Sequence, residues 1–263
     1  MFPSHALGYL YGWARRARLL HVTSFQRLIY VPSYFLYKRL LEDPLARLLA
    51  NRPTLLGNGN IFDIGANIGY TTCVLARRVS LGKKVIAVEP DPDNFRILGH
   101  VLHWKGFVDQ TIAVRRGISQ TDGSALLSLN PRHPGDHRIV SDDSPGDDRA
   151  RIRVDLSRLD TLATELSILN DISFVKIDVQ GAELAVCRGM ERILTTNKGR
   201  ISLLVEFQLD QANARQTTEL WLYLTRYGFR GTYLADHRAL RAINTFGELP
   251  KEGYSNILFT DSF

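Results

Sequence analysis

The residues with the clearest chemical potential form the segment Asp63–Gly69 (DIGANIG), between an apolar run and a helical pattern. Glycines at 65 and 69 allow a sharp turn and let a ligand approach the backbone. The helix that follows presents free N–H groups at its start. These features predict a ligand-binding turn between a strand and a helix, although a plain tight turn is the alternative.

The glycine pattern of the turn indicates which class of ligand it binds. A dinucleotide-binding turn has the pattern G-x-G-x-x-G, whose middle glycine is absent here. An aspartate before the turn suits a cationic ligand with an amino group better than a pyrophosphate. Asp63 therefore favours the methionine part of S-adenosylmethionine.

Glu89 supplies a second signal for a nucleoside. It ends the apolar run KVIAVE, 20 residues after Gly69. A carboxylate at such a strand end can accept hydrogen bonds from both ribose hydroxyls. Acids at strand ends are common, but this one follows the glycine turn at the expected distance. We therefore predict that Glu89 binds the ribose of S-adenosylmethionine, the methyl donor.

A third group of charged residues lies in FVKIDVQGAE, where Lys176 and Asp178 alternate in an otherwise apolar strand. Asp178 falls at the carboxyl end, where open α/β sheets bind their ligands. If the group that receives the methyl is an alcohol, it must lose a proton, and we predict Asp178 as the catalytic base that takes this proton. Lys176, Glu183 and Glu206 are predicted to contact the substrate or support the residues that do. The structural alternative is that Lys176 pairs with an acid and Glu183 stabilises a helix start.

His137 is the second candidate for a catalytic base. It lies in residues 130–150, where three prolines, two glycines and many Asp and Arg residues are unsuited to a core element. Such a long loop is usually functional or disordered, and both interpretations stay open. A lid formed by this loop would carry His137 over the sheet edge, whereas most loop histidines are simply solvated.

Strands and helices must alternate to bring these residues together. Apolar runs predict strands at 60–65, 84–89, 108–114, 151–155, 174–179, 202–207, 229–235 and 255–260, with part of a hairpin at 122–129. Helical spacing predicts helices from 70, at 91–104, 158–168, around 186–194, and at 212–227. This order predicts an α/β fold with a mostly parallel sheet and helices on both faces.

The composition is that of a globular protein, with 263 residues, 44% hydrophobic and 23% charged. No apolar run approaches the roughly 20 residues that span a bilayer, and the N-terminus is a poor secretory signal, so a cytoplasmic location is expected. Cys73 and Cys187 lie in apolar helical patterns and not at metal-ligand spacing. We expect two reduced core thiols and no metal site.

The net charge of +6 belongs to the first 58 residues, and the remainder is neutral. We therefore divide the chain into an extension at 1–57 and a catalytic domain at 58–263. Residues 5–50 combine basic and aromatic side chains with helical spacing. They are interpreted either as a cap or dimer contact, or as a peripheral contact with the inner face of the membrane.

The motifs together resemble the FkbM family of S-adenosylmethionine-dependent methyltransferases over about residues 58–260. The residues that carry the resemblance are DIGANIGYTT, VIAVEPDPDNF, SRLDTL, FVKIDVQGAELAVCRGM and LLVEF. The resemblance implies a Rossmann-like class I methyltransferase fold, with a seven-stranded sheet whose last strand is antiparallel. It also implies O-methylation of a sugar or natural-product hydroxyl.

The resemblance also implies positions for the donor. It places Asp63, Gly65, Asn67 and Gly69 on the methionine side of S-adenosylmethionine and Glu89 on the ribose. One position departs from the family, which usually has KIDVEGAE where this chain has Gln180. A role that needs a charge there is in doubt, but donor binding is not.

Other functions are less well supported. A nucleic-acid base methyltransferase, or another N-methyltransferase, commonly carries Asn/Asp-Pro-Pro-aromatic where residues 178–181 read Asp-Val-Gln-Gly, and the catalytic part is neutral. We therefore expect a small-molecule or glycan acceptor and no nucleic acid. A non-catalytic module that binds a membrane or partner on a degenerate fold remains an alternative, although the intact Asp63 and Glu89 argue against degeneration.

Overall fold

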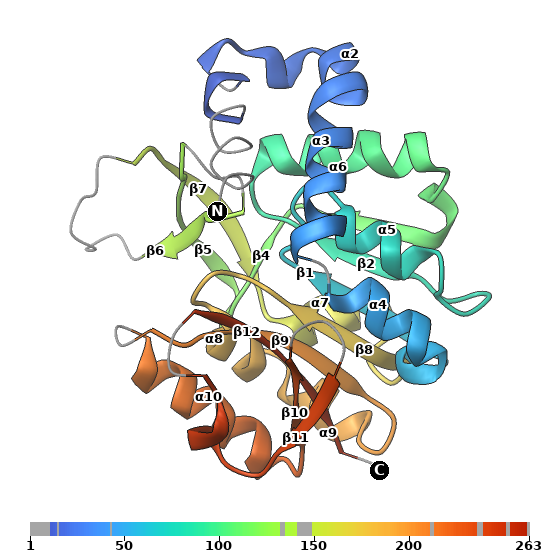
Figure 1. The fold of residues 1–263 in the computed structure, drawn as a ribbon, viewed down its shortest axis with the longest axis vertical. Helices are drawn as coiled ribbons and strands as arrows, with labels where there is room; N and C mark the ends of the chain where they lie inside the picture. The colour runs from blue at the N-terminus through green and yellow to red at the C-terminus, as the bar shows by residue number, and fades with distance from the viewer. Residues whose placement is uncertain are drawn as a thin grey trace.

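The structure, a computed structural model, describes residues 11–14, 16–42, 44–131, 135–140, 149–210, 213–235, 239–250 and 253–261. Parts of two predicted segments, at 5–10 and within 130–150, therefore lie outside the described residues. An eight-stranded sheet forms the centre of the molecule (Figure 1), in the order β11-β10-β12-β9-β8-β1-β2-β3. Its strands are β1 (Asn60–Ile64), β2 (Val85–Val88), β3 (Thr111–Val114), β8 (Ile172–Ile177), β9 (Ser202–Gln208), β10 (Arg230–Ala235), β11 (Ala239–Ile243) and β12 (Tyr254–Thr260).

The sheet is mostly parallel, as predicted. β3, β2, β1, β8 and β9 run in one direction, and β12 is antiparallel to both β9 and β10. The predicted α/β class is therefore confirmed, including the antiparallel last strand. The predicted count of seven is wrong, because β11 adds an eighth, antiparallel strand beside β10. With Arg241 inside so short a run, β11 has too weak an apolar pattern to be predicted.

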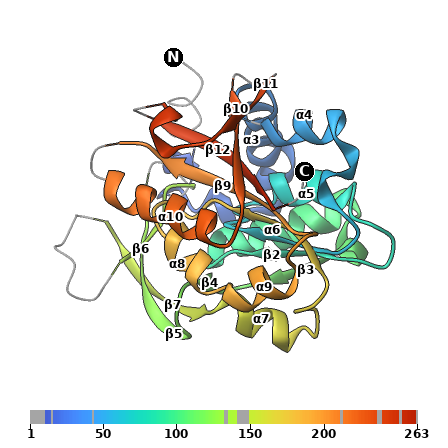
Figure 2. The same ribbon diagram turned by 90° about the horizontal axis from the view of Figure 1, so that it is seen from below.

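Helices cover both faces of this sheet (Figure 2). One face carries α7 (Leu159–Glu165), α8 (Glu183–Arg188), α9 (Glu191–Thr196) and α10 (Ala214–Arg226). The other carries α4 (Pro44–Asn51), α5 (Tyr70–Ala76) and α6 (Pro92–Lys105). The single helix expected around 186–194 is divided at Gly189, where a Cβ would lie 2.1 Å from the Ser119 carbonyl oxygen. The close backbone contact explains the break.

Residues of each central strand alternate between the two faces. In β1, Phe62 and Ile64 pack towards α7 and α8, whereas Ile61 packs with α4 and α5. Asp63 follows the same alternation and accepts a hydrogen bond from Thr72 on α5. Lys176 occupies the position paired with Asp63 on β8. Asp63 and Lys176 therefore lie on the face covered by α4 and α5.

A small second sheet lies beside the main one, with β4 (Gly117–Ile118), β5 (Gly123–Ser128), β6 (Arg138–Val140) and β7 (Arg151–Ser157) in the order β4-β7-β5-β6. The strand predicted at 151–155 lies here and not in the main sheet. The hairpin predicted at 122–129 supplies β5, which pairs with β6 and β7. Residues 130–150 were expected to form a long loop without regular structure. This is wrong at 138–140, because β6 pairs its backbone with the edge of β5.

The N-terminal segment is helical, as expected, and packs on the α6 side of the sheet. An almost continuous helix runs from Thr23 through α3 (Val31–Tyr37) to Glu42, with π-helical turns at 26–30 and 38–42. Tyr30 and Tyr34 are buried in one cluster with α6 residues. These contacts support the interpretation as a cap, and the boundary at 57/58 stays a prediction. No described helix is long and apolar enough to cross a bilayer.

Candidate active site

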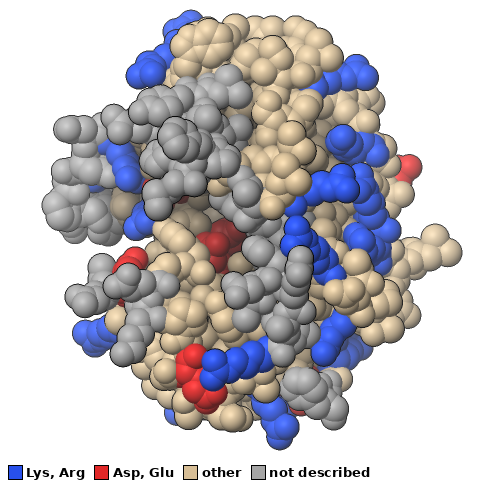
Figure 3. All heavy atoms as spheres, viewed as in Figure 1, with Lys and Arg blue, Asp and Glu red and all other residues tan. Residues whose placement is uncertain are grey.

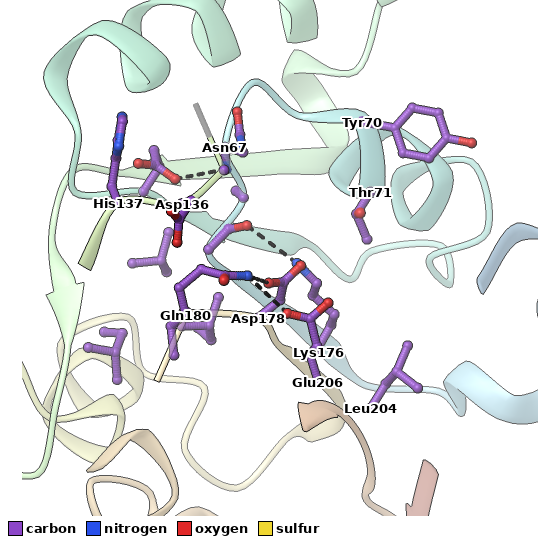
Figure 4. A pocket seen from close by; sticks show the side chains of 18 of the residues that line it. Asn67, Tyr70, Thr71, Asp136, His137, Lys176, Asp178, Gln180, Leu204 and Glu206 are labelled. Carbon is purple, nitrogen blue, oxygen red and sulfur yellow. Dashed lines mark hydrogen bonds and ion pairs between the residues drawn. The ribbon is translucent and has the colours of Figure 1, made fainter. Parts of the chain in front are cut away.

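A cavity of about 750 Å³ opens at the carboxyl ends of β1, β2, β8 and β9 (Figure 4). Most of the predicted site residues line it, namely Gly65, Asn67, Glu89, His137, Lys176, Asp178 and Glu206. Asp63, Gly69 and Glu183 lie outside its lining. The carboxyl ends of parallel strands meet here, and this is where ligands bind in open α/β sheets.

The glycine turn after β1 serves the packing of the chain on itself. Gly65 has φ +79°, and a Cβ there would lie 1.9 Å from the backbone oxygen of Asp178. Gly69 has φ +91°, and its Cβ would lie 2.6 Å from Cδ1 of Leu98 on α6. Sequence reasoning assigned both glycines to ligand approach. The structure adds that each also permits a close contact within the protein.

We expect Gly65→Ala to lower the free energy of unfolding by about 3 kcal/mol or more, because the new methyl group meets a backbone carbonyl at positive φ. Gly82→Ala is the matched control, since Gly82 has the same φ of +79° with nothing within 4 Å of its Cβ. That variant should lose about 1 kcal/mol. Urea denaturation measures both values, and equal losses would contradict the proposed clash.

Glu89 and Asn67 form one wall of the cavity. The Asn67 N–H donates to Oε2 of Glu89 at 2.8 Å, and the Asp91 N–H donates to Oε1 at 3.0 Å. Asn67 has φ +51°, in the left-handed region that Asn tolerates better than most residues. Burial raises the pKa of Glu89 to about 8, although the hydrogen bonds from Asp91 and Asn67 act in the opposite direction. The carboxyl group is thus fixed on the cavity wall, with acceptor capacity left for a ligand.

Lys176 lies between two carboxylates below the turn. Its Nζ is 3.5 Å from Oδ1 of Asp63 and 3.2 Å from Oδ2 of Asp178, and it donates to the Gly65 carbonyl at 3.3 Å. Burial alone would lower the pKa of Lys176, but Asp178 and Asp63 outweigh it and raise the pKa. Asp63 is fully buried, with Oδ2 accepting from the Thr72 hydroxyl at 2.6 Å. It therefore contacts Lys176 and not the cavity.

The second pair of acids is bridged by an amide (Figure 4). Nε2 of Gln180 donates to Oδ1 of Asp178 at 3.2 Å and to Oε2 of Glu206 at 2.9 Å. Burial opposes ionisation of Asp178, but Lys176 and Lys38 outweigh it and lower its pKa. Burial and the charge of Asp178 raise the pKa of Glu206 well above its usual value. Asp178 is therefore the more acidic member of the pair and Glu206 the less acidic one.

His137 lies at the other end of the cavity, on the side of Asn67 and Asp136 (Figure 4). Its Nδ1 accepts the Asn130 N–H at 3.0 Å, and its Nε2 is 3.7 Å from Oδ2 of Asp91. The neutral ring with this hydrogen bond carries its proton on Nε2, which then acts as a donor. The geometry favours Asp178 over His137 as a proton acceptor.

Glu183 shapes the loop after β8. Its carboxylate accepts the N–H groups of Gly181 at 3.0 Å and Val179 at 3.3 Å. It is buried at the start of α8. These contacts fit the structural interpretation of Glu183, because they hold the loop that carries Gln180.

Several polar side chains that line the cavity were not assigned by sequence reasoning, among them Lys38, Arg116 and Gln180. The sequence did mark Gln180, because it is the position that departs from the FkbM pattern. In the structure its φ is +54°, in a tight turn. No such signal marked Lys38 and Arg116. They reach the site from the N-terminal helix and from the connection between β3 and β4, where no spacing in the sequence predicts proximity to β8.

The fold and the site define a class I methyltransferase, with the glycine turn after β1, the acid at the end of β2 and the antiparallel last strand. Residues 63–230 match the family model described as the methyltransferase FkbM domain. The chain belongs to this family and is an S-adenosylmethionine-dependent methyltransferase, which confirms the resemblance.

Two curated proteins illustrate the relationship. Methyltransferase sdnD of Sordaria araneosa is 26% identical over 64% of this chain and 73% of its own length. Hexuronic acid methyltransferase AglP of Haloferax volcanii is 29% identical over 51% of each chain. Among solved structures, the O-methyltransferase from Bacillus cereus in complex with SAH has a TM-score of 0.51 at 14% identity, covering 90% of this chain and 93% of that one. This last likeness shows the fold alone.

The residues present fit the methyl donor. The fixed Glu89 carboxyl group can accept hydrogen bonds from the ribose hydroxyls, and the turn from Gly65 to Asn67 borders the same cavity. Among the residues that the structure describes, no group of three or more His, Cys, Asp and Glu side chains is placed to hold a metal ion.

Proposed function

We propose that this chain transfers a methyl group from S-adenosylmethionine to a hydroxyl oxygen of a sugar or natural-product acceptor. The observation that carries the proposal is the pair Asp178 and Glu206, bridged by Gln180 on the cavity wall. A hydroxyl nucleophile must lose its proton as the oxygen attacks, and an ionised carboxylate can take it. Within the pair, Asp178 has the lowered pKa and is the proposed proton acceptor.

The donor is proposed to lie along β1 and β2. Glu89 would accept the ribose hydroxyls, and the turn that contains Gly65 and Asn67 would border the methionine part. Asp63 would act indirectly, since it contacts Lys176 below the turn. When bound, S-adenosylmethionine supplies an activated methyl group on a sulfonium.

The protein's own residues align and deprotonate the acceptor. Asp178 would accept the hydroxyl proton at a carboxylate oxygen that faces the cavity. The positive charge of Lys176 lowers the pKa of Asp178 and favours its ionised form, whereas burial and the charge of Asp178 raise the pKa of Glu206. Alignment of oxygen and methyl carbon supplies a further, large part of the rate.

An acceptor with several hydroxyl groups fits the lining. Tyr34, Tyr70, Tyr233 and Tyr254 border the cavity, and aromatic residues with hydroxyl groups suit sugars, which have both apolar and polar faces. Lys38 and Arg116 add two basic side chains. The likeness to a hexuronic acid methyltransferase supports a sugar as the acceptor.

The test is a mass spectrum of sugars, uronic acids and natural-product alcohols after incubation with isotopically labelled donor. We expect one labelled methyl group to replace one hydroxyl hydrogen, in an ether bond that resists mild alkali. A label released by alkali would mean that a carboxylate, and not a hydroxyl, is the acceptor. A label on nitrogen would contradict the proposal.

Lys38 provides a separate prediction for this mechanism. Lys38 is one of the charges that lower the pKa of Asp178, so removing it raises that pKa. Because Asp178 must be ionised to accept a proton, we expect Lys38→Met to move the acid limb of the kcat profile upward by ~0.5–1 pH unit. An unchanged limb would show that Lys38 does not act on the base. Arg39→Met, an exposed neighbour outside the cavity, is the control.

A further inference from the structure

The N-terminal segment exposes an unusual amount of apolar surface. Among the residues that the structure describes, ten large apolar side chains are exposed, and six of them lie between Trp13 and Leu40, a span of about a tenth of the chain. The six are Trp13 (53%), Val22 (42%), Leu28 (73%), Ile29 (48%), Leu36 (58%) and Leu40 (62%). Single exposed leucines need no explanation, but a cluster indicates an interaction surface.

The cluster follows one side of the helix from Thr23 to Glu42. Leu28, Leu36 and Leu40 are spaced by multiples of four residues, with exposed Pro32 between them, so they form a ridge along the helix. The opposite side, with Tyr30 and Tyr34, is buried against the domain. A surface helix normally turns polar residues to solvent. This helix is apolar on both sides, so its outer side lacks the usual polar cover.

The charged residues of this segment before Glu42 are all basic. The first 41 residues contain no Asp or Glu. Arg16, Arg18, Arg27 and Arg39 are exposed on the same segment. Figure 3 shows the corresponding surface, largely uncharged over α3 with basic side chains along one margin. An apolar ridge with exposed Arg residues on the same segment is complementary to an anionic bilayer, where apolar groups enter the boundary and Arg meets the headgroups.

We propose that this apolar ridge, formed by Leu28, Leu36 and Leu40 with Ile29 next to Leu28, docks the enzyme on an anionic lipid bilayer. A second copy of the chain fits less well, because a two-fold dimer places the same patch on both subunits. The Arg residues beside the ridge would then oppose each other. A bilayer with anionic headgroups attracts them instead.

Docking would also place the active site near the membrane. Tyr34 and Lys38, from the same helix as the ridge, line the cavity. The diameter of a helix with its side chains is about 10 Å, so the cavity would lie at about that distance from the headgroups. The docking itself does not depend on the acceptor, and it can be tested without one.

The experiment is flotation of the full chain with vesicles of phosphatidylcholine alone and of equal parts phosphatidylcholine and phosphatidylglycerol. We expect the wild type to float with the anionic vesicles, less with the neutral ones, and less as salt is added. Leu36→Glu/Leu40→Glu should reduce binding by at least ~10-fold, because two leucines no longer enter the boundary. Leu81→Glu/Leu222→Glu is the matched control, with two exposed leucines outside the segment and the same change of charge.

Donor affinity, measured by calorimetry, should be unchanged in both double variants, because none of the four leucines lines the cavity. This readout separates failure of docking from failure of the proposed function. Absence of flotation by the wild type, or equal losses in both variants, would overturn the proposal. Light scattering that shows a dimer in the wild type and a monomer in the ridge variant, without vesicle binding, would assign the ridge to a second copy.

Discussion

Asp178→Asn is expected to reduce kcat by ~10²–10⁴-fold, the usual contribution of a positioned base, while donor affinity stays near the wild-type value. The amide keeps the size of the carboxyl group and can still accept the hydrogen bond from Gln180. It cannot take a proton from a hydroxyl. Steady-state kinetics and donor calorimetry together separate the two effects.

The matched control for this variant lies at the other end of the same strand. Asp171 precedes β8 and pairs with Lys83 at 2.7 Å, whereas Asp178 follows β8 and lines the cavity. Asp171→Asn should leave turnover nearly unchanged. Full activity in Asp178→Asn would remove this residue from the mechanism and turn attention to His137.

Lys176→Met is expected to reduce stability more than any other single charge removal discussed above. Asp63 is fully buried and Lys176 is its ion-pair partner, so the variant leaves a buried carboxylate with only the Thr72 hydroxyl. Breaking a buried pair in this way costs about 3–5 kcal/mol. The pKa of Asp178 should rise as well, because Lys176 is the main charge that lowers it.

Lys83→Met tests whether burial is the cause. The Lys83–Asp171 pair is short, but its side chains are 29% and 41% exposed, so its loss should cost about 1 kcal/mol or less. Thermal and urea denaturation of both variants measure the difference. Similar small losses would show that the Asp63–Lys176 pair contributes no more than a surface pair.

Much of the fold was predictable because the signals were local. The glycine turn after β1 and the alternation of apolar runs depend on neighbours in the sequence, and they predicted the parallel sheet. β11 and β6 were missed because both are short edge strands held by backbone pairing, with little apolar pattern of their own. Edge strands bury one neighbour fewer, so their sequences are less constrained.

The site was predictable to the extent that it lies at strand ends. Asp178 and Glu206 were expected together because adjacent parallel strands end at the same edge, and Gln180 does bridge them. Lys38 was not predictable, since it reaches the cavity from a helix far away in the sequence. The position of Asp63 in the site could likewise not be predicted from the sequence. Only packing shows that Lys176 lies between Asp63 and Asp178.

The account depends most on the donor site at Glu89, and titration calorimetry with S-adenosylmethionine tests it directly. We expect the wild type to bind the donor and Glu89→Ala to bind it about 10- to 100-fold more weakly, the range for losing two hydrogen bonds to the ribose hydroxyls. Glu219→Ala, an exposed acid on α10 paired with Arg188, should bind like the wild type. Equal affinity in wild type and Glu89→Ala, or no binding by either, would contradict the assignment.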